Sequence, residues 1–155
     1  MGSRACGRAA LVVAFILAAT PSAAQQPHDL SIDEAMGGHT LARHVGRTDA
    51  QLAERLRLEK QISAASTYTD RAAAERSVGA ALTDGGTKLS NWQRRVGRRP
   101  NLVLYYAEPS RKTIGRSLTR GRTSSVPCTR AIVVLRWDDQ KNKSYVLTSY
   151  PEADR

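Results

Sequence analysis

The apolar positions of this chain change their spacing near Pro100, from a helical period to a strand period. Before Pro100, apolar residues recur three and four positions apart, which is typical of amphipathic helices. After it, β-branched and aromatic residues gather in short runs, which is typical of strands. Helices first and antiparallel strands afterwards predict an α+β fold, with N-terminal helices packed on a C-terminal antiparallel sheet.

Three helices are expected in the first part of the chain. Thr48 and Gln51 have the spacing of a capping box, so the first should begin there and run to about Lys60, with Leu52 and Leu56 on its apolar side. The other two are expected between Thr69-Asp70 and Gly85-Gly86, and from Leu89 to Val96.

The second part of the chain predicts strands. The strongest feature is a hairpin, in which an apolar run from Arg130 to Trp137 is followed by a polar turn over residues 138–143 and a return strand to Tyr150. Asn101 to Ala107 predicts a further strand, and Lys112 to Leu118 a weaker one. Residues 121–127 are expected to form a mobile, arginine-bearing loop.

The first 24 residues have the organisation of an export signal. Arg4 and Arg8 precede an apolar run over residues 9–19, and small residues before Gln25 offer a cleavage site. The run is shorter than the roughly 20 residues that span a bilayer, although an uncleaved anchor is the alternative. We therefore expect a periplasmic or secreted protein with no stable membrane insertion after cleavage.

Cleavage would leave 155 − 24 = 131 residues, which suits one domain. We expect a polar leader over residues 25–37 and the domain over residues 38–155. Of the two cysteines, Cys6 leaves with the signal and Cys128 remains alone. No internal disulfide can then form, so the domain must fold on packing. Dimerisation through Cys128 is an alternative, but a monomer with an unpaired thiol is expected.

The positive charge is large and uneven. The formal net charge is +10, and the segment from Arg94 to Arg130 holds ten basic residues against one acid, Glu108. Because arginine forks match phosphate geometry, this indicates contact with nucleic acid or phosphate. A solvated surface or a membrane-surface binder is the alternative. The residues expected to make this contact are Arg94, Arg95, Arg98, Arg99, Arg116, Arg120 and Arg122.

Four side chains could move a proton and hold an oxyanion without a metal. Thr148 and Tyr150 lie two apart in the last strand and should share a face, opposite Ser149. His44 precedes the capped helix that carries Arg55, and the start of a helix favours a nearby anion.

A second imidazole, His39, lies five residues before His44. A zinc site from His39, His44 and Asp49 would match no common ligand spacing. We therefore expect neither a metal nor another cofactor.

Several short sequences, taken in order, resemble a known bacterial domain. They are Gly-Gly-His-Thr-Leu-x-x-His-Val-Gly from Gly37, Ala65 to Asp70, Ile114-Gly115-Arg116 and the closing Val-Leu-Thr-Ser-Tyr-Pro to Pro151. This set is similar to the RNase A-like toxin domain at the C-terminal tip of contact-dependent growth inhibition proteins. The resemblance covers nearly the whole mature chain.

The resemblance implies a pancreatic-ribonuclease-like fold without disulfides, an RNA substrate and a cognate immunity protein. It implies catalytic roles for His44, Arg55, Thr148 and Tyr150 in metal-independent cleavage by the 2′-hydroxyl of RNA. This chain differs from the family setting in carrying its own export signal. Two other hypotheses stay open: a secreted, non-catalytic binder of nucleic acid or another polyanion, and a periplasmic structural or adaptor protein.

Overall fold

A computed structural model describes residues 26–154 of the protein, so the expected export signal lies outside the described residues. No helix within residues 26–154 is both long and apolar enough to cross a bilayer. The described helices are α1 (Leu30–Glu34), α2 (Thr40–His44), α3 (Asp49–Leu58), α4 (Arg71–Asp84) and α5 (Gly86–Gln93). The strands are β1 (Ala64–Tyr68), β2 (Leu102–Ala107), β3 (Gly115–Thr119), β4 (Val126–Cys128), β5 (Arg130–Asp138) and β6 (Lys143–Glu152).

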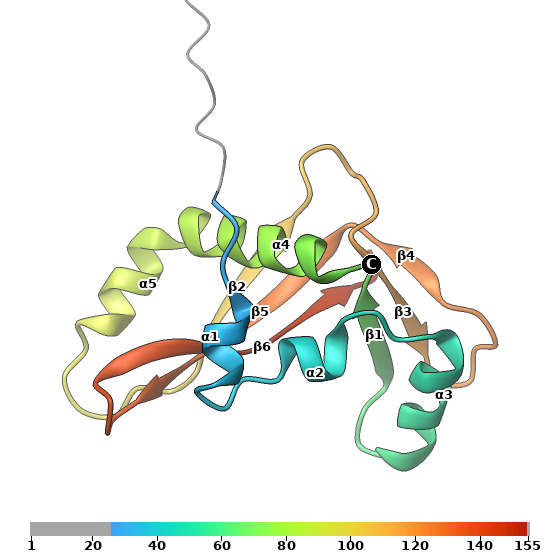
Figure 1. Ribbon diagram of the computed structural model, residues 1–155, viewed down its shortest axis with the longest axis horizontal. Coiled ribbons are helices and arrows are strands. Elements are labelled where there is room, and N and C mark those ends of the chain that lie inside the picture. The colour runs from blue at the N-terminus through green and yellow to red at the C-terminus, as the bar shows by residue number, and fades with distance from the viewer. Residues whose placement is uncertain (1–25, 155) are drawn as a thin grey trace, which may run out of the picture.

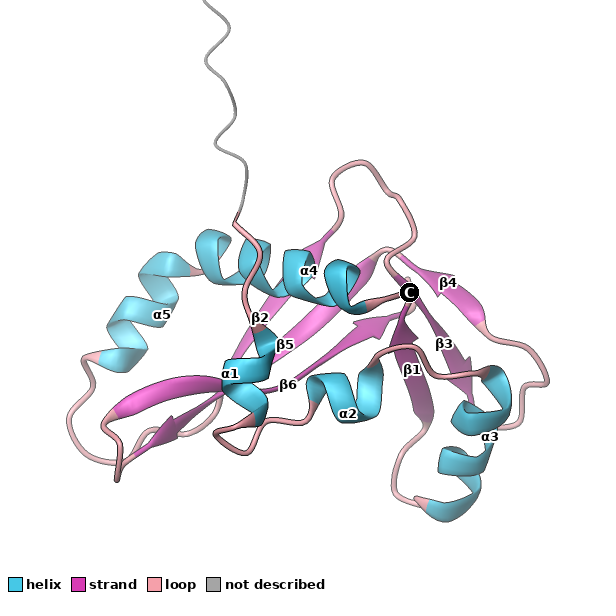
Figure 2. Ribbon diagram, viewed as in Figure 1, coloured by secondary structure: helices cyan, strands magenta, loops and turns pink. Residues whose placement is uncertain are grey.

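The strands form two antiparallel sheets of three, in the orders β2-β5-β6 and β1-β3-β4. Helix α4 lies along one face of the first sheet (Figure 1), where Val78 packs with Leu104 and Val133 in the main core. Helix α3 covers the second sheet through Leu52 and Leu56. All five described helices end before β2 begins, and Figure 2 distinguishes these helices from the strands by colour. The predicted α+β class is confirmed.

The two sheets come closest where β3 meets the end of β6. A Cβ atom at Gly115 would lie 2.4 Å from the carbonyl oxygen of Thr67 and 2.6 Å from Cγ of Pro151. Only a residue without a side chain fits between a strand backbone and a proline ring at these distances. Gly115 therefore brings the C-terminal half of β6 against the second sheet.

The outer edge of β6 is covered by the first two helices. The Asp33 carboxylate accepts the Val146 N–H at 2.7 Å, and Thr40 Oγ1 accepts the Ser149 N–H at 2.8 Å. The His39 N–H donates to the Leu147 carbonyl at 3.0 Å. These bonds occupy an edge that would otherwise be free to pair with another chain. They also fix the segment carrying His39 and His44 against β6.

The local expectations were met unevenly. The capping box at Thr48 and the β5-β6 hairpin are present. Helix α5 begins at Gly86, earlier than expected, and the end of the predicted mobile loop forms β4. The segment expected as a polar leader contains α1, and Leu30 is fully buried in the core. Neither α2 nor β1 was expected.

Candidate active site

A cavity of about 510 Å³ lies where β6 meets the second sheet. It brings together residues from α2, α3 and both sheets. All five residues expected to carry chemistry line it: His39, His44, Arg55, Thr148 and Tyr150. These five residues are spread over more than 100 positions of the sequence. They come together because the two sheets pack against each other and the first two helices cover the edge of β6.

His44 is the last residue of α2 and is buried, with 6% of its surface exposed. It precedes the capped helix α3, as expected, but it ends a short helix of its own, which was not expected. Its Nδ1 lies 3.1 Å from the Ser66 carbonyl oxygen. A carbonyl can only accept, so Nδ1 carries the proton and Nε2 keeps its lone pair. The Tyr150 ring lies alongside, with ring centroids 5.4 Å apart.

Burial holds the pKa of His44 far below its usual value, at about 3. The positive charge of Arg55 lowers this pKa further, while the hydrogen bond to Ser66 opposes the change. The imidazole is therefore neutral at pH 7. A neutral imidazole with a free Nε2 can accept a proton, so His44 is suited to act as a base rather than an acid.

We expect the stability of the fold to depend on pH through His44. Its folded pKa is depressed, so between pH 6.5 and about 3 the unfolded state binds a proton that the folded state does not. Stability should therefore fall as the pH drops from 6.5, by about 1.4 kcal/mol per unit. Urea denaturation at pH 6.5 and 5.0 measures this fall. A His44→Gln variant should show a clearly smaller fall, with the contribution of His39, whose pKa is also lowered by burial, remaining. An equal fall in both proteins would contradict the depressed pKa of His44.

Arg55 and Thr148 bring unpartnered donors to the cavity. Nε of Arg55 donates to the Glu59 carboxylate at 3.2 Å, which orients the guanidinium. Arg55 Nη1 and Thr148 Oγ1 are both buried, and neither has a hydrogen-bond partner among the described residues. Buried polar groups are almost always paired in native proteins. Two unpaired donors beside a cationic group indicate a place for an anion.

Tyr150 is half-buried, and burial raises the pKa of its phenol above the usual value, helped by the charge of Glu152. A raised pKa makes the phenol a weaker acid and keeps its proton in place. Tyr150 is therefore better suited to donate a hydrogen bond than to release a proton.

The surrounding residues include some that the sequence did not single out. Glu59 lies four positions after Arg55, just past the end of α3, and holds its guanidinium; this spacing could have indicated it. The Ser66 carbonyl fixes the His44 tautomer, and no sequence pattern indicates a backbone acceptor of this kind. Ser117 and Thr119 also line the cavity.

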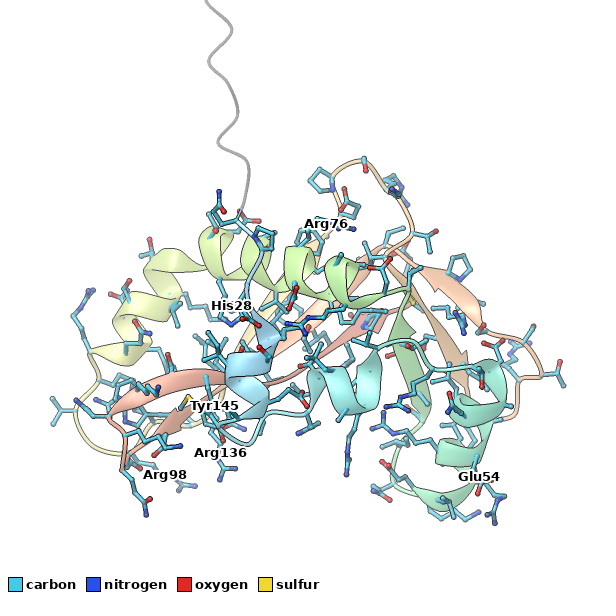
Figure 3. All side chains as sticks on the ribbon, in the orientation of Figure 1. His28, Glu54, Arg76, Arg98, Arg136 and Tyr145 are labelled. Carbon is cyan, nitrogen blue, oxygen red and sulfur yellow. The ribbon has the colours of Figure 1, made fainter. Side chains whose placement is uncertain are left out.

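The arginines expected to contact RNA divide into two groups. Arg94, Arg95, Arg98 and Arg99 follow α5, and Figure 3 labels Arg98 at the end of the molecule opposite α3. The structure does not bring this group to the cavity. Arg99 instead lies over the Trp137 ring at 4.1 Å.

The other group surrounds α3. Arg116 donates to the Asp49 carboxylate at 2.7 Å, at the start of the helix. Arg120 donates to the Glu59 carbonyl at 2.9 Å, just past its end. Both guanidinium groups thus attach α3, and with it Arg55, to the second sheet. Arg122 is exposed in the following turn. Contact of these residues with RNA stays a prediction.

Residues 26–154 contain no group of three or more His, Cys, Asp or Glu side chains able to hold a metal ion. The alternative of a zinc site from His39, His44 and Asp49 is therefore not supported by their placement. Asp49 instead accepts hydrogen bonds from Arg116 and Ser125.

Two comparisons match the chain to known proteins. The family described as the bacterial CdiA-CT RNAse A domain matches residues 38–151. The crystal structure of a CdiA-CT/CdiI complex from Y. kristensenii is similar in fold, with a TM-score of 0.64 and 28% identity. The match covers 74% of this chain and 99% of that one. No curated protein matches the chain in sequence.

Proposed function

Because the chain belongs to the bacterial CdiA-CT RNAse A domain family, we propose that it is a toxin that cleaves RNA without a metal ion. The observation that carries this proposal is the cavity itself. A neutral imidazole with a free Nε2 lies beside two buried donors that have no partner in the described part of the chain. Base and anion-binding donors together are what cleavage of a phosphodiester requires.

In the proposed reaction, Nε2 of His44 takes the proton of an RNA 2′-hydroxyl. The 2′ oxygen attacks the adjacent phosphorus, the bond from phosphorus to the 5′ oxygen breaks, and the leaving 5′ oxygen takes a proton from water to become a hydroxyl. The protonated His44 then returns its proton to solvent. Arg55 and Thr148 donate hydrogen bonds to the phosphate oxygens, where negative charge grows. Tyr150 donates a further hydrogen bond. His39 lines the same cavity and stays a secondary candidate.

A bound substrate phosphate also changes the pKa of His44. In the free protein, burial and Arg55 hold its pKa at about 3, which makes it a weak base. A bound phosphate brings negative charge beside the imidazole and offsets Arg55. The pKa of His44 therefore rises when RNA is bound, toward the range where a base is most effective.

The direct test is cleavage of single-stranded RNA by purified residues 25–155, with and without excess EDTA. We expect equal rates in both, and a 2′,3′-cyclic phosphate on the product. DNA of the same sequence should be inert because it lacks the 2′-hydroxyl. Loss of cleavage on chelation would contradict the metal-free mechanism.

The polar groups of Thr148 and Tyr150 should matter for turnover. Tyr150→Phe removes only the hydroxyl, and we expect turnover to fall by about 100-fold, the usual effect of losing one donor to a developing oxyanion. Thr148→Val should act in the same way. Both rates are measured at matched folded fraction, set from thermal melts.

Ser149 supplies the control, because it faces away from the cavity. Its Oγ lies 2.6 Å from the Tyr68 hydroxyl and 2.9 Å from the Ile132 carbonyl, and it is fully buried. Ser149→Ala should lower stability by about 1–3 kcal/mol, since it leaves the buried Tyr68 hydroxyl unpaired, but keep the rate of the folded protein. Equal loss of turnover in Ser149→Ala and Tyr150→Phe would contradict the assignment of faces.

We further propose an exported protein with an inhibitor of its own. The Y. kristensenii relative was crystallised with CdiI, and the sequence of residues 1–24 has the pattern of an export signal. An active ribonuclease is tolerated in the producing cell only when it is exported or inhibited. A signal-less form should therefore stop growth unless its inhibitor is present.

A further inference from the structure

The β2-β5-β6 sheet has one face, its open face, on which Val103, Ile132 and Val134 stay partly exposed within residues 26–154. On the other face, Tyr106, Val133 and their neighbours pack against α4. Alternation places a separate set on the open face, in cross-strand rows fixed by the register. One row is Tyr105, Ile132 and Tyr150, and the next is Val103, Val134 and Thr148. The active-site residues of β6 are thus the last members of two rows that continue across the sheet.

Tyr105 stands at the far end of its row and is 63% exposed, while the next residue, Tyr106, is buried. The Tyr105 side chain has no hydrogen-bond partner within the described chain. Within residues 26–154, five large apolar residues are exposed, and Tyr105 is the aromatic one among them. An exposed aromatic ring with no internal partner is a common feature of binding surfaces for flat ligands.

The open face is continuous with the catalytic cavity. Ile132 lines the cavity and is the direct strand partner of Tyr105 on one side and of Tyr150 on the other. Two strand spacings separate Tyr105 from Tyr150, or about 10 Å between Cα atoms. A ligand held at the cavity can therefore extend over Ile132 to Tyr105.

We propose that Tyr105 is a base-binding residue, on whose ring a nucleobase of single-stranded RNA stacks when the scissile phosphate occupies the cavity. This inference rests on the proposed function. The row of Tyr105, Ile132 and Tyr150 carries no charged side chain. The row on its other side, away from Thr148, holds the Arg130–Glu152 ion pair at 3.8 Å. An uncharged aromatic and aliphatic strip suits a base rather than a phosphate. Stacking accepts any base, so it adds affinity with little sequence preference.

The test uses an oligonucleotide with a single ribose at the cleavage point and deoxyribose elsewhere, and a series in which one base at a time is removed. On the intact substrate, Tyr105→Ala should raise KM by about 10-fold, the loss of one stacked base, and change kcat by less than about threefold. Tyr105→Phe should behave like the parent. Ile32→Ala is the control, because Ile32 is exposed to a similar extent, 60%, on α1 outside the cavity.

The abasic series then locates the contact. The parent should lose affinity when one particular base is removed, and Tyr105→Ala should not respond at that position. If the parent cleaves RNA and Tyr105→Ala has the same KM and the same abasic profile, the base site is wrong and the proposed function stands. The open face would then be better explained as a surface for a protein partner.

If the parent protein does not cleave RNA, the proposed function is wrong, but Tyr105 can still bind a base. Fluorescence anisotropy with the uncleavable 2′-O-methyl oligonucleotide separates the two. About 10-fold weaker binding by Tyr105→Ala supports a base site in a non-catalytic RNA binder. Equal binding by Tyr105→Ala and the parent overturns it.

Discussion

Replacement of His44 by alanine is expected to lower kcat for RNA cleavage by about 10²- to 10⁴-fold, the usual contribution of a positioned general base. Affinity for uncleaved RNA should change little, because the neutral imidazole contributes no charge to binding. Single-turnover cleavage and anisotropy with the uncleavable oligonucleotide measure the two quantities separately. This split between turnover and affinity is the main distinction between an enzyme and a binder.

His28 provides a matched control. It is the histidine outside the cavity, and its Nε2 lies 2.6 Å from the Asp33 carboxylate, which raises the pKa of His28. His28→Ala should alter stability but leave the rate of the folded protein unchanged. If the parent and His44→Ala bind RNA equally and neither cleaves it, the chain is the non-catalytic binder of polyanions.

Replacement of Arg55 by glutamine should lower kcat/KM by about 10²- to 10³-fold, since it removes a donor from the phosphate as charge develops. It should also raise the pKa of His44, because Arg55 is the second-largest cause of its depression after burial. An NMR titration of the His44 ring follows this second effect in the absence of RNA. Arg55→Lys keeps the charge but not the planar fork, so its rate should be intermediate.

Arg57 lies on the same helix and is a suitable control for Arg55. It is exposed and paired with Glu54 by two hydrogen bonds of 2.6 and 2.7 Å. Arg57→Gln removes the same charge from the protein and should change the rate only slightly. Equal losses in the Arg55 and Arg57 variants would mean that net charge, and not a specific contact, promotes cleavage.

The parts of the fold that were predictable are those that local chemistry determines. The capping box at Thr48 needs only residues 48–51, and the β5-β6 hairpin needs two apolar runs and a polar turn. Alternation along β6 was enough to place Thr148 and Tyr150 on one face. These features depend on neighbouring residues, so the sequence displays them directly.

The parts that were missed depend on tertiary contacts. Helix α2 has five residues, and its N-cap residue, His39, makes no side-chain cap bond. It is held by bonds from His39 and Thr40 to β6. Strand β1 is rich in small and polar residues and extends because it pairs with β3. The composition also could not separate arginines that attach α3, such as Arg116 and Arg120, from arginines that stay exposed, such as Arg122.

The assembly of the cavity from distant segments has a consequence for the order of synthesis. His44 and Arg55 are made early, but Thr148 and Tyr150 follow Arg55 by more than 90 residues. The Val146 N–H that Asp33 accepts is 113 positions away. A nascent chain in which β6 has not yet been synthesised therefore lacks Thr148 and Tyr150, even if its N-terminal helices have already formed. If the protein cleaves RNA as proposed, ribosome-bound and truncated chains should be inert toward the RNA around them, and cleavage should begin only once the last strand is in place.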